Sequence, residues 1–191
     1  MNIIGISGSP NSNGNNEKVI NIALDIAKKR GFDVEKIFLS EKAVAPCTDC
    51  GVCKDKEECS IDDDMDELYP LLENADGIIV SSPVYFGSVS AQLKALFDRT
   101  LLLRRKDFSL KDKIGGAIAI GRSRNGGQEK TIGAIQDWMH IHGMIVVGDN
   151  NHFGGILQAP IEKDEIGLQT ATDTANKVCE VLNLVKSSKQ G

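Results

Sequence analysis

The chain has 191 residues, with 22 Lys and Arg against 27 Asp and Glu, and its formal net charge at pH 7 is −5. This length predicts one domain with a full hydrophobic core over residues 1–191. The acidic balance and the lack of a long basic stripe exclude nucleic acid as an expected partner, and no apolar run reaches the roughly 18 residues of a membrane-spanning helix. The first residues lack the features of a signal peptide, so we expect a cytoplasmic protein with reduced thiols.

Short apolar runs alternate with longer helical patterns, as in α/β proteins with a parallel sheet. The runs typical of strands cover residues 2–7, 34–39, 77–82, 114–120 and 144–147. The helical patterns cover residues 16–30, a segment after the acidic residues 62–64, residues 91–103, a segment from the 121–127 loop through 139, and the carboxyl-terminal segment after a long loop over 149–164. This order predicts a flavodoxin-like, doubly wound sheet of five parallel strands in the order 2-1-3-4-5, within a three-layer sandwich. The binding crevice of such a sheet lies beyond the carboxyl ends of its strands.

Four cysteines follow the second predicted strand within a single short segment. They are Cys47, Cys50, Cys53 and Cys59, with the spacing C-x2-C-x2-C-x5-C. Zinc sites usually divide their ligands into two separated pairs, whereas this spacing approaches the C-x2-C-x2-C run of bacterial ferredoxins. The loop over 47–59 therefore favours a single [4Fe-4S] cluster, with zinc ligation or redox-active thiols as the alternatives. The fifth cysteine, Cys179, lies in the apolar pattern of the last helix and is expected to be buried.

The loop after the first predicted strand, residues 7–16, is rich in serine, asparagine and glycine. It has neither the G-x-G-x-x-G pattern of dinucleotide sites nor the Gly-Lys-Ser/Thr of a Walker loop. Backbone amides, a helix N-terminus and short polar side chains hold a phosphate dianion without a paired cation. An ordinary polar loop with a helix cap is the alternative, but the position after the first strand of a doubly wound sheet favours phosphate.

Two further loops follow the third and fourth predicted strands. The first reads Pro83-Val84-Tyr85-Phe86-Gly87-Ser88, in which a proline and a glycine bracket two aromatic residues that suit a flat ligand. Packing of Phe86 in the core is an equal alternative. The second loop, 121–128, contains Arg122 and Arg124, which either contact a bound ring or nicotinamide phosphate or are only solvated.

Residues 83–99, read as P-V-Y-F-G-S-V-S-A-Q-L-K-A-L-F-D-R, closely resemble a segment of NADPH-dependent FMN reductase-like flavoproteins. With the cysteine run, nearly the whole chain resembles the iron-sulfur flavoprotein family of anaerobic archaea and bacteria. This resemblance implies an oxidoreductase with FMN and a [4Fe-4S] cluster as cofactors. It places FMN phosphate contacts on Ser9, Asn11, Ser12, Asn13, Asn15 and Asn16, and ring contacts on Pro83, Val84, Tyr85, Phe86, Gly87 and Ser88, with the 121–128 loop, including Gly126, at the pyrimidine end. Asn16 departs from the family pattern, since many relatives carry Thr or Ser there.

Together these features predict a protein that passes electrons between a one-electron carrier such as ferredoxin and an acceptor such as a quinone, dioxygen or peroxide. No catalytic triad or carboxylate pair is evident, so we assign no catalytic residue. The resemblance also implies a homodimer or homotetramer in which the cluster approaches the flavin of a neighbouring subunit. Two alternatives are an NAD(P)H-dependent FMN or quinone reductase with structural cysteines, and a non-catalytic flavodoxin-like carrier or zinc-stabilised interaction module.

The other polar residues have ordinary structural interpretations. The acidic residues 62–64 are expected to cap a helix rather than bind a metal. The basic residues 104–106 are expected to end a helix, where they complement its dipole. We expect His140, His142 and His152 to be solvated or capping residues, and Trp138 to pack in the core.

Overall fold

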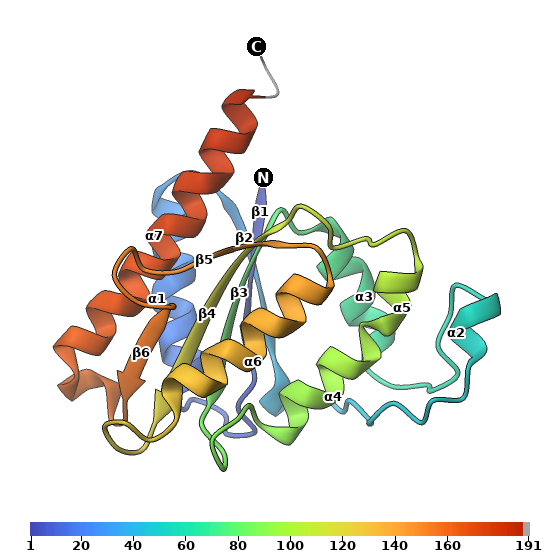
Figure 1. Cartoon of the computed structure of the whole chain (residues 1–191), viewed down its shortest axis with the longest axis horizontal. Coiled ribbons are helices and arrows are strands. Elements are labelled where there is room, and N and C mark those ends of the chain that lie inside the picture. Colours follow the sequence, from blue (N-terminus) through green and yellow to red (C-terminus); the bar gives the residue numbers. More distant parts are fainter. Residues whose placement is uncertain (189–191) are drawn as a thin grey trace.

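The computed structural model describes residues 1–188, so residues 189–191 of the predicted domain lie outside the described part. A parallel sheet lies at its centre and has helices on both faces (Figure 1). The principal strands are β1 (Asn2–Ser7), β2 (Asp33–Phe38), β3 (Gly77–Pro83), β4 (Ile114–Gly121) and β5 (Ile145–Val147). They follow the order β2-β1-β3-β4-β5, which confirms the predicted flavodoxin-like fold.

Seven α-helices and two short 3-10 turns connect these strands within the described residues. They are α1 (Asn15–Lys29), α2 (Val52–Asp55), α3 (Met65–Asn74), α4 (Ala91–Arg99), α5 (Leu101–Arg105), α6 (Gln128–Ile141) and α7 (Glu165–Ser188), with η1 (Leu39–Glu41) and η2 (Ile161–Lys163). None of the helices in this described part is long and apolar enough to cross a membrane.

The sheet divides the core into two apolar layers, because side chains of successive strand residues point to opposite faces. One layer packs the sheet against α3, α4 and α6, and the other packs it against α1 and α7. All eight residues of β4 are buried, as expected for a strand covered on both faces. Cys179 of α7 is fully buried in the second layer, and Trp138 of α6 is buried in the first, which confirms both predictions.

A sixth strand, β6 (Gly155–Gln158), lies within the segment 149–164 that the sequence predicts as a loop. It pairs with the carboxyl half of β4, residues 118–121, because β5 pairs only with residues 114–116. The short run Gly-Ile-Leu-Gln has no pattern that distinguishes it from a loop, so only the free edge of β4 makes it a strand.

The predicted helix over 91–103 is divided at Thr100 into α4 and α5. The Thr100 hydroxyl donates to the Phe97 carbonyl at 2.6 Å, and such a local bond competes with regular helix geometry. In Figure 1 the cysteine segment with α2 extends past these two helices, away from the sheet. The loops after β1, β3 and β4 gather at the opposite edge from the N-terminus, as the fold requires.

Candidate functional site

The loop between β1 and α1 is fixed by its neighbours at the carboxyl edge of the sheet. The Gly8 amide donates to the Ser81 carbonyl at 2.7 Å, and the Ser90 hydroxyl donates to the Gly8 carbonyl. Gly8 is required there, because a Cβ atom would lie 2.8 Å from Leu93 of α4. Helix α1 begins after Gly14, and no described side chain caps it. Its first amide N–H groups are therefore free to bind an anion.

The six predicted phosphate residues divide into exposed and buried groups. Asn11, Ser12 and Asn13 are exposed, Asn15 is half-buried, and Ser9 and Asn16 are buried. The Ser9 hydroxyl oxygen accepts the Asn11 amide at 3.1 Å, and the Asn16 side-chain oxygen accepts the Ser81 hydroxyl at 2.7 Å. The two buried residues thus hold the loop in shape. The Asn16 side chain keeps only its NH₂ group for a ligand.

Ser7, the last residue of β1, has a buried hydroxyl without a hydrogen-bond partner among the described residues. Alternation along the strand places it on the same face as Gly5, whose Cβ would meet Ile20 of α1. This polar atom therefore lies on the α1 side of the sheet, at the end of the strand that leads into the loop. Buried hydroxyls are normally paired, so its position fits a polar ligand in the crevice.

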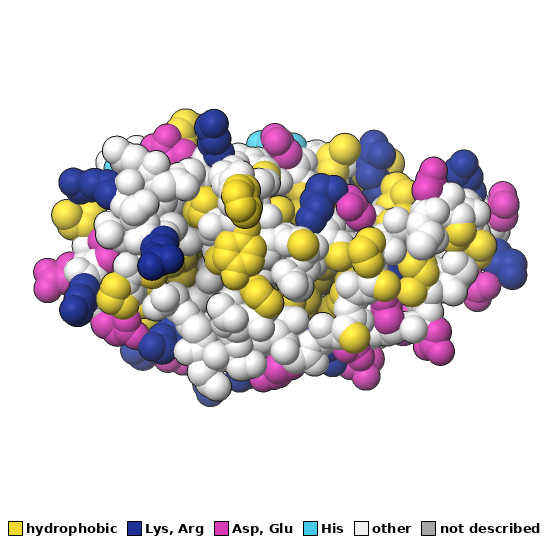
Figure 2. Space-filling model, turned by 90° about the horizontal axis from the view of Figure 1, so that it is seen from below, with side chains coloured by type: hydrophobic (Ala, Val, Ile, Leu, Met, Phe, Trp, Pro, Cys, Tyr) yellow, Lys and Arg dark blue, Asp and Glu magenta, His cyan; other side chains and the backbone are white. Residues whose placement is uncertain are grey.

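The turn after β3 presents two aromatic side chains to solvent. Tyr85 and Ser88 exchange amide–carbonyl bonds of 3.0 and 3.1 Å around Phe86 and Gly87, whose φ angles are 49° and 77°. Positive φ at both central residues defines a type I′ turn. The Phe86 side chain is fully exposed, so it does not pack in the core, and Tyr85 is 43% exposed. Figure 2 shows this face of the molecule, with hydrophobic side chains gathered at its centre.

The loop after β4 packs directly against this turn. Gly127 has a φ of 107°, and a Cβ atom on it would lie 3.1 Å from the Gly87 Cα and 3.2 Å from Val84. The Gln128 side chain donates to the carbonyls of Ser123 and Leu157, at 2.9 and 3.2 Å, and so joins the loop to β6. The structure therefore brings together the two loops that the sequence predicts to border one flat ligand.

The remaining residues of the 121–128 loop have different surroundings. Gly126 is exposed at its surface, and a Cβ atom there would lie 2.9 Å from the Ser123 carbonyl oxygen. Arg122 and Arg124 are both exposed. Their predicted contact with a ligand stays a prediction, as does the alternative that they are solvated.

The four clustered cysteines line a single pocket beside α4 and α5. Three of their sulfur atoms have hydrogen-bond partners: the Asp49 amide at 3.4 Å from Cys47, the Ser60 hydroxyl at 3.0 Å from Cys50, and the Arg105 guanidinium at 2.7 Å from Cys53. The Ser60 hydroxyl lowers the pKa of the Cys50 thiol. Hydrogen-bond donors and a cation favour thiolates, the form in which cysteine binds metals. Within residues 1–188, however, no three His, Cys, Asp or Glu side chains approach closely enough to share one metal ion.

Arg105 belongs to the basic residues 104–106 that the sequence interpretation assigns only to a helix end. Helix α5 does end at Arg105, as predicted. The sequence does not predict the contact with Cys53, because residues 53 and 105 are 52 positions apart in the chain. A sequence motif gives no signal for such a long-range pair.

Asp63 has the capping role that the sequence predicts, and it also has a partner that the sequence does not indicate. Its carboxylate accepts the Met65 amide at 3.0 Å, but its main partner is the buried guanidinium of Arg99, at 2.6 and 3.0 Å. Asp64 occupies the N-cap position of α3 without a side-chain cap bond, and its carboxylate instead accepts the Ala43 amide. Burial tends to raise the pKa of Asp63, but the Arg99 guanidinium and the backbone amides of Ala45 and Met65 together outweigh it and lower the pKa.

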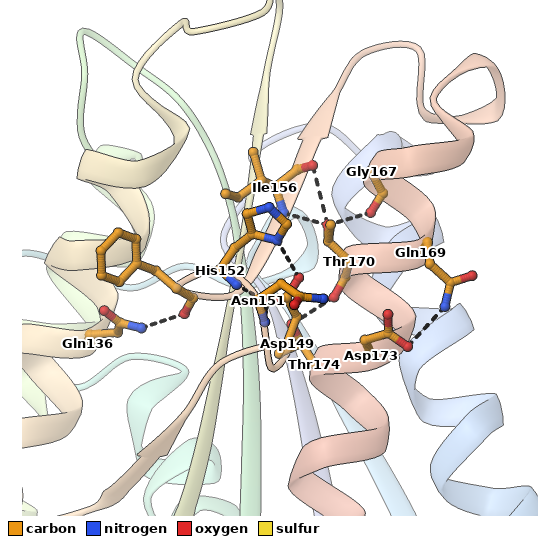
Figure 3. A network of polar contacts seen from close by, with 11 residues as sticks. Gln136, Asp149, Asn151, His152, Ile156, Gly167, Gln169, Thr170, Asp173 and Thr174 are labelled. Atoms are coloured by element: carbon orange, nitrogen blue, oxygen red, sulfur yellow. Dashed lines mark hydrogen bonds and ion pairs between the residues drawn. The ribbon is translucent and has the colours of Figure 1, made fainter.

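Of the three histidines, His152 is exposed, as predicted, and His142 occupies the C-cap position of α6 but has a buried side chain instead of a solvated one. His142 is 2% exposed, and its Nε2 lies 2.9 Å from the Thr100 hydroxyl. His152 pairs with the buried carboxylate of Asp149, with 2.7 Å between Nδ1 and Oδ2, beside Thr170 of α7 (Figure 3). Burial tends to raise the pKa of Asp149, but the interactions with His152 and with the Asn151 amide together outweigh it and lower the pKa. His140 is exposed, as predicted.

Comparison with known proteins agrees with this geometry. The model of the family described as NADPH-dependent FMN reductase matches residues 1–155. An iron-sulfur flavoprotein of Methanosarcina thermophila is 59% identical over 189 residues, which cover 99% of both chains. One of Methanocaldococcus jannaschii is 49% identical, covering 97% of this chain and 100% of that protein.

A solved structure shows the fold independently. The flavodoxin-like WrbA-like protein from Agrobacterium tumefaciens superposes with a TM-score of 0.67 at 18% identity, covering 96% of this chain and 98% of that one. At this identity the likeness concerns the fold alone. The family assignment comes from the sequence matches: this chain belongs to the NADPH-dependent FMN reductase family, among its iron-sulfur flavoproteins, and is an oxidoreductase.

Proposed function

We propose that this protein passes electrons between a one-electron carrier such as ferredoxin and an acceptor, with FMN in the crevice and one [4Fe-4S] cluster in the loop over 47–59. The observation that carries the proposal is the gathering of four thiols from one loop in one pocket of a flavodoxin-like fold. In this proposal residues 1–191 form a single FMN-binding domain that includes the cluster loop.

The crevice residues fit FMN in three ways. The uncapped N-terminus of α1 suits a phosphate dianion, and the buried Ser7 hydroxyl lacks a partner among the described residues. The 121–128 loop lies against the turn at Gly87, where a flat ring would be bordered on two sides. We propose phosphate contacts from Ser9, Asn11, Ser12, Asn13, Asn15 and Asn16, and ring contacts from Pro83, Val84, Tyr85, Phe86, Gly87, Ser88 and Gly126.

The cysteine pocket fits a cluster better than a single zinc ion. The proposed ligands are Cys47, Cys50, Cys53 and Cys59. Each thiolate of a [4Fe-4S] site binds a different iron, so these thiolates stand farther apart than four ligands of one ion. The four thiols line one pocket, which supports this proposal. Hydrogen bonds to three of the sulfurs are also typical of the environments that tune such clusters.

When bound, FMN exchanges one or two electrons and the cluster exchanges one, so the pair would connect a one-electron carrier to a two-electron acceptor. The protein supplies position and charge. Arg105 places a cation beside Cys53, and the exposed turn at Tyr85 and Phe86 borders the side from which an acceptor reaches the crevice. This open face suits a small acceptor such as a quinone, dioxygen or peroxide.

We also propose a homodimer or homotetramer in solution. A groove between α4, α5 and α6 is lined in part by Val89, Leu101 and Ile141, and the Ile141 side chain is 56% exposed. Exposed apolar surface of this kind is common where subunits meet. Light scattering after gel filtration measures the mass, and a monomer would contradict this part of the proposal.

Anaerobic purification followed by iron, sulfide, FMN and absorption measurements tests the cofactor assignment. We expect one FMN and about four irons per chain. Cys50→Ala should lose the cluster absorption and keep FMN, whereas Cys179→Ala should keep both. Zinc in place of iron, or a Cys50→Ala variant with unchanged iron, would contradict the ligand assignment.

Electron donors distinguish the proposal from an NAD(P)H-dependent reductase. Stopped-flow mixing of the oxidised protein with reduced ferredoxin, and separately with NADPH, gives the rate of flavin reduction by each. The proposal expects faster reduction by ferredoxin, and a rate that falls in Cys50→Ala. Rapid reduction by NADPH that survives loss of iron would instead support the reductase.

A further inference from the structure

Arg99, the last residue of α4, carries a charge that is almost entirely buried, with its side chain 1% exposed. Burial of a guanidinium costs free energy unless it is paired and hydrogen-bonded. Burial tends to lower the pKa of Arg99, but the hydrogen bond to Asp63 and the interactions with Tyr69 and Cys59 together outweigh it and raise the pKa above its ordinary value. The side chain therefore stays charged, and its hydrogen-bond partners show which segments of the chain it joins.

The partners of Arg99 come from both ends of the cysteine loop. Its Nη1 atom donates to the Ala45 carbonyl at 3.0 Å, two residues before Cys47. Its Nη2 atom donates to the Ile61 carbonyl at 3.2 Å, two residues after Cys59. The bidentate pair with Asp63 adds bonds of 2.6 and 3.0 Å. The guanidinium thus binds both stems of the cysteine loop, which we define as residues 43–46 before Cys47 and residues 60–63 after Cys59.

Asp63 completes the connection between the stems. Its Oδ2 atom accepts the Ala45 amide at 2.8 Å as well as the Arg99 guanidinium. Ala45 therefore has both of its backbone polar groups bound to this ion pair. Between these two segments, residues 46–50 are all exposed and have little packing of their own, whereas Cys53 and Cys59 pack partly against the core.

Arg99 also lines the pocket that contains the four thiols, and its Nε atom is buried without a partner among residues 1–188. Tyr69 supports it from α3, because the Tyr69 hydroxyl donates to the Arg99 carbonyl at 3.2 Å. At its other end, α4 is capped by Ser90, whose hydroxyl holds the Gly8 carbonyl of the loop after β1. A helix of nine residues, about 13 Å long, therefore connects the crevice to the cysteine pocket.

We propose that Arg99 is a positioning residue for the cluster: by joining the two stems of the cysteine loop to the end of α4, it gathers the four thiols in one pocket before any iron is bound. The proposal rests on the proposed function for the identity of the pocket's occupant. The arrangement of the stems themselves is a property of the chain without metal. The two ideas can therefore fail separately.

The test compares Arg99→Lys, the double variant R99M/D63N and the control Arg104→Met. Lysine keeps the charge but cannot form the bidentate pair and reach both stem carbonyls. The double variant removes the ion pair without leaving a buried unpaired charge, which protects the fold. Arg104 lies on the adjacent α5 and donates to the Ile141 carbonyl, away from the loop stems.

Three measurements are made on each full-length protein. FMN content checks the fold and the crevice. Iron content and the electron paramagnetic resonance spectrum of the reduced protein report the cluster. Amide hydrogen exchange of peptides covering 43–48 and 59–64, after iron is removed by a chelator, reports the stems alone.

We expect normal FMN content in all the variants. In R99M/D63N both stem peptides should exchange on the order of a hundredfold faster than in the unmodified protein, and most of the iron should be lost. Arg99→Lys should lose part of the iron and change the spectrum, while Arg104→Met should behave as the unmodified protein does. Unchanged stem exchange in R99M/D63N would overturn the proposal even if the unmodified protein holds no iron. Unchanged iron and spectrum in that variant would overturn it as well.

Discussion

His142 makes a quantitative prediction about how stability depends on pH. Burial, and next the positive charge of Arg104, lower the pKa of His142 to about 4 from an ordinary value of 6.5. The Thr100 hydroxyl donates to the Phe97 carbonyl and accepts from the Trp138 indole at 2.9 Å. It therefore accepts from His142 Nε2, and the imidazole is neutral with an unprotonated Nδ1. That Nδ1 is buried without a partner among the described residues, so a proton on it would have no acceptor.

The sign of the effect follows from proton binding. Between pH 6.5 and 4 the unfolded chain binds a proton at this histidine and the folded chain does not, so folding is weakened as the pH falls. With a folded pKa of about 4, the loss amounts to about 2 kcal/mol at pH 5 and about 3 kcal/mol at pH 4, relative to pH 8. His142→Gln should remove this part of the pH dependence, because glutamine carries no titrating proton.

Urea denaturation between pH 8 and pH 4 measures the free energy of unfolding of His142→Gln and of the unmodified protein. The carboxylates and any bound cofactor are common to both proteins, so the difference between the two curves reports the histidine. His140→Gln is the matched control, since His140 is exposed two residues earlier on α6. Parallel curves for His142→Gln and the unmodified protein would refute the reasoning.

Three further predictions concern the crevice and the cysteine loop. Gly127→Ala should weaken FMN binding about tenfold more than Gly87→Ala. Both glycines have positive φ, but only a Cβ atom at position 127 would contact the backbone of the facing turn. Equilibrium titration with FMN measures the two affinities, and equal effects would contradict this prediction. Arg105→Gln should lower the reduction potential of the cluster by on the order of tens of mV, because the cation beside Cys53 is lost. A redox titration followed by electron paramagnetic resonance measures this potential. An unchanged potential would exclude an effect of Arg105 on the cluster. Cys179→Ala should cost about 1 kcal/mol in the free energy of unfolding and leave iron content unchanged, and any loss of iron would contradict its assignment to the core.

Much of the fold follows from local patterns. Uncharged runs with a β-branched centre, such as residues 77–82 with Ile78, Ile79 and Val80, are buried on both faces, and the order of strands follows from their alternation with helices. The predicted limits of the strands agree with the structure to within a residue or so. The four-residue β6 is the exception, since it exists only because β4 offers an unpaired edge.

His142 and Asp63 show where local patterns were incomplete. A histidine near a helix end is usually solvated, but His142 is buried at the end of α6, where its Nε2 contacts the buried Thr100 hydroxyl of another segment. The acidic residues 62–64 have the pattern of a helix cap. The ion pair of Asp63 has no local signal, because its partner Arg99 lies 36 positions away at the end of another helix. Neither partner could be recognised without knowing which helices pack together.

From the order of its residues alone, this protein is defined as a flavodoxin-like sheet with a four-cysteine loop, because strand periodicity and cysteine spacing are local properties of the chain. The contacts between distant segments depend on the tertiary structure. In it the loops after β3 and β4 pack against each other at Gly87 and Gly127, and Arg99 and Arg105 lie beside the cysteine loop. Such contacts join distant segments, and their energies arise only when burial removes charges and backbone groups from water.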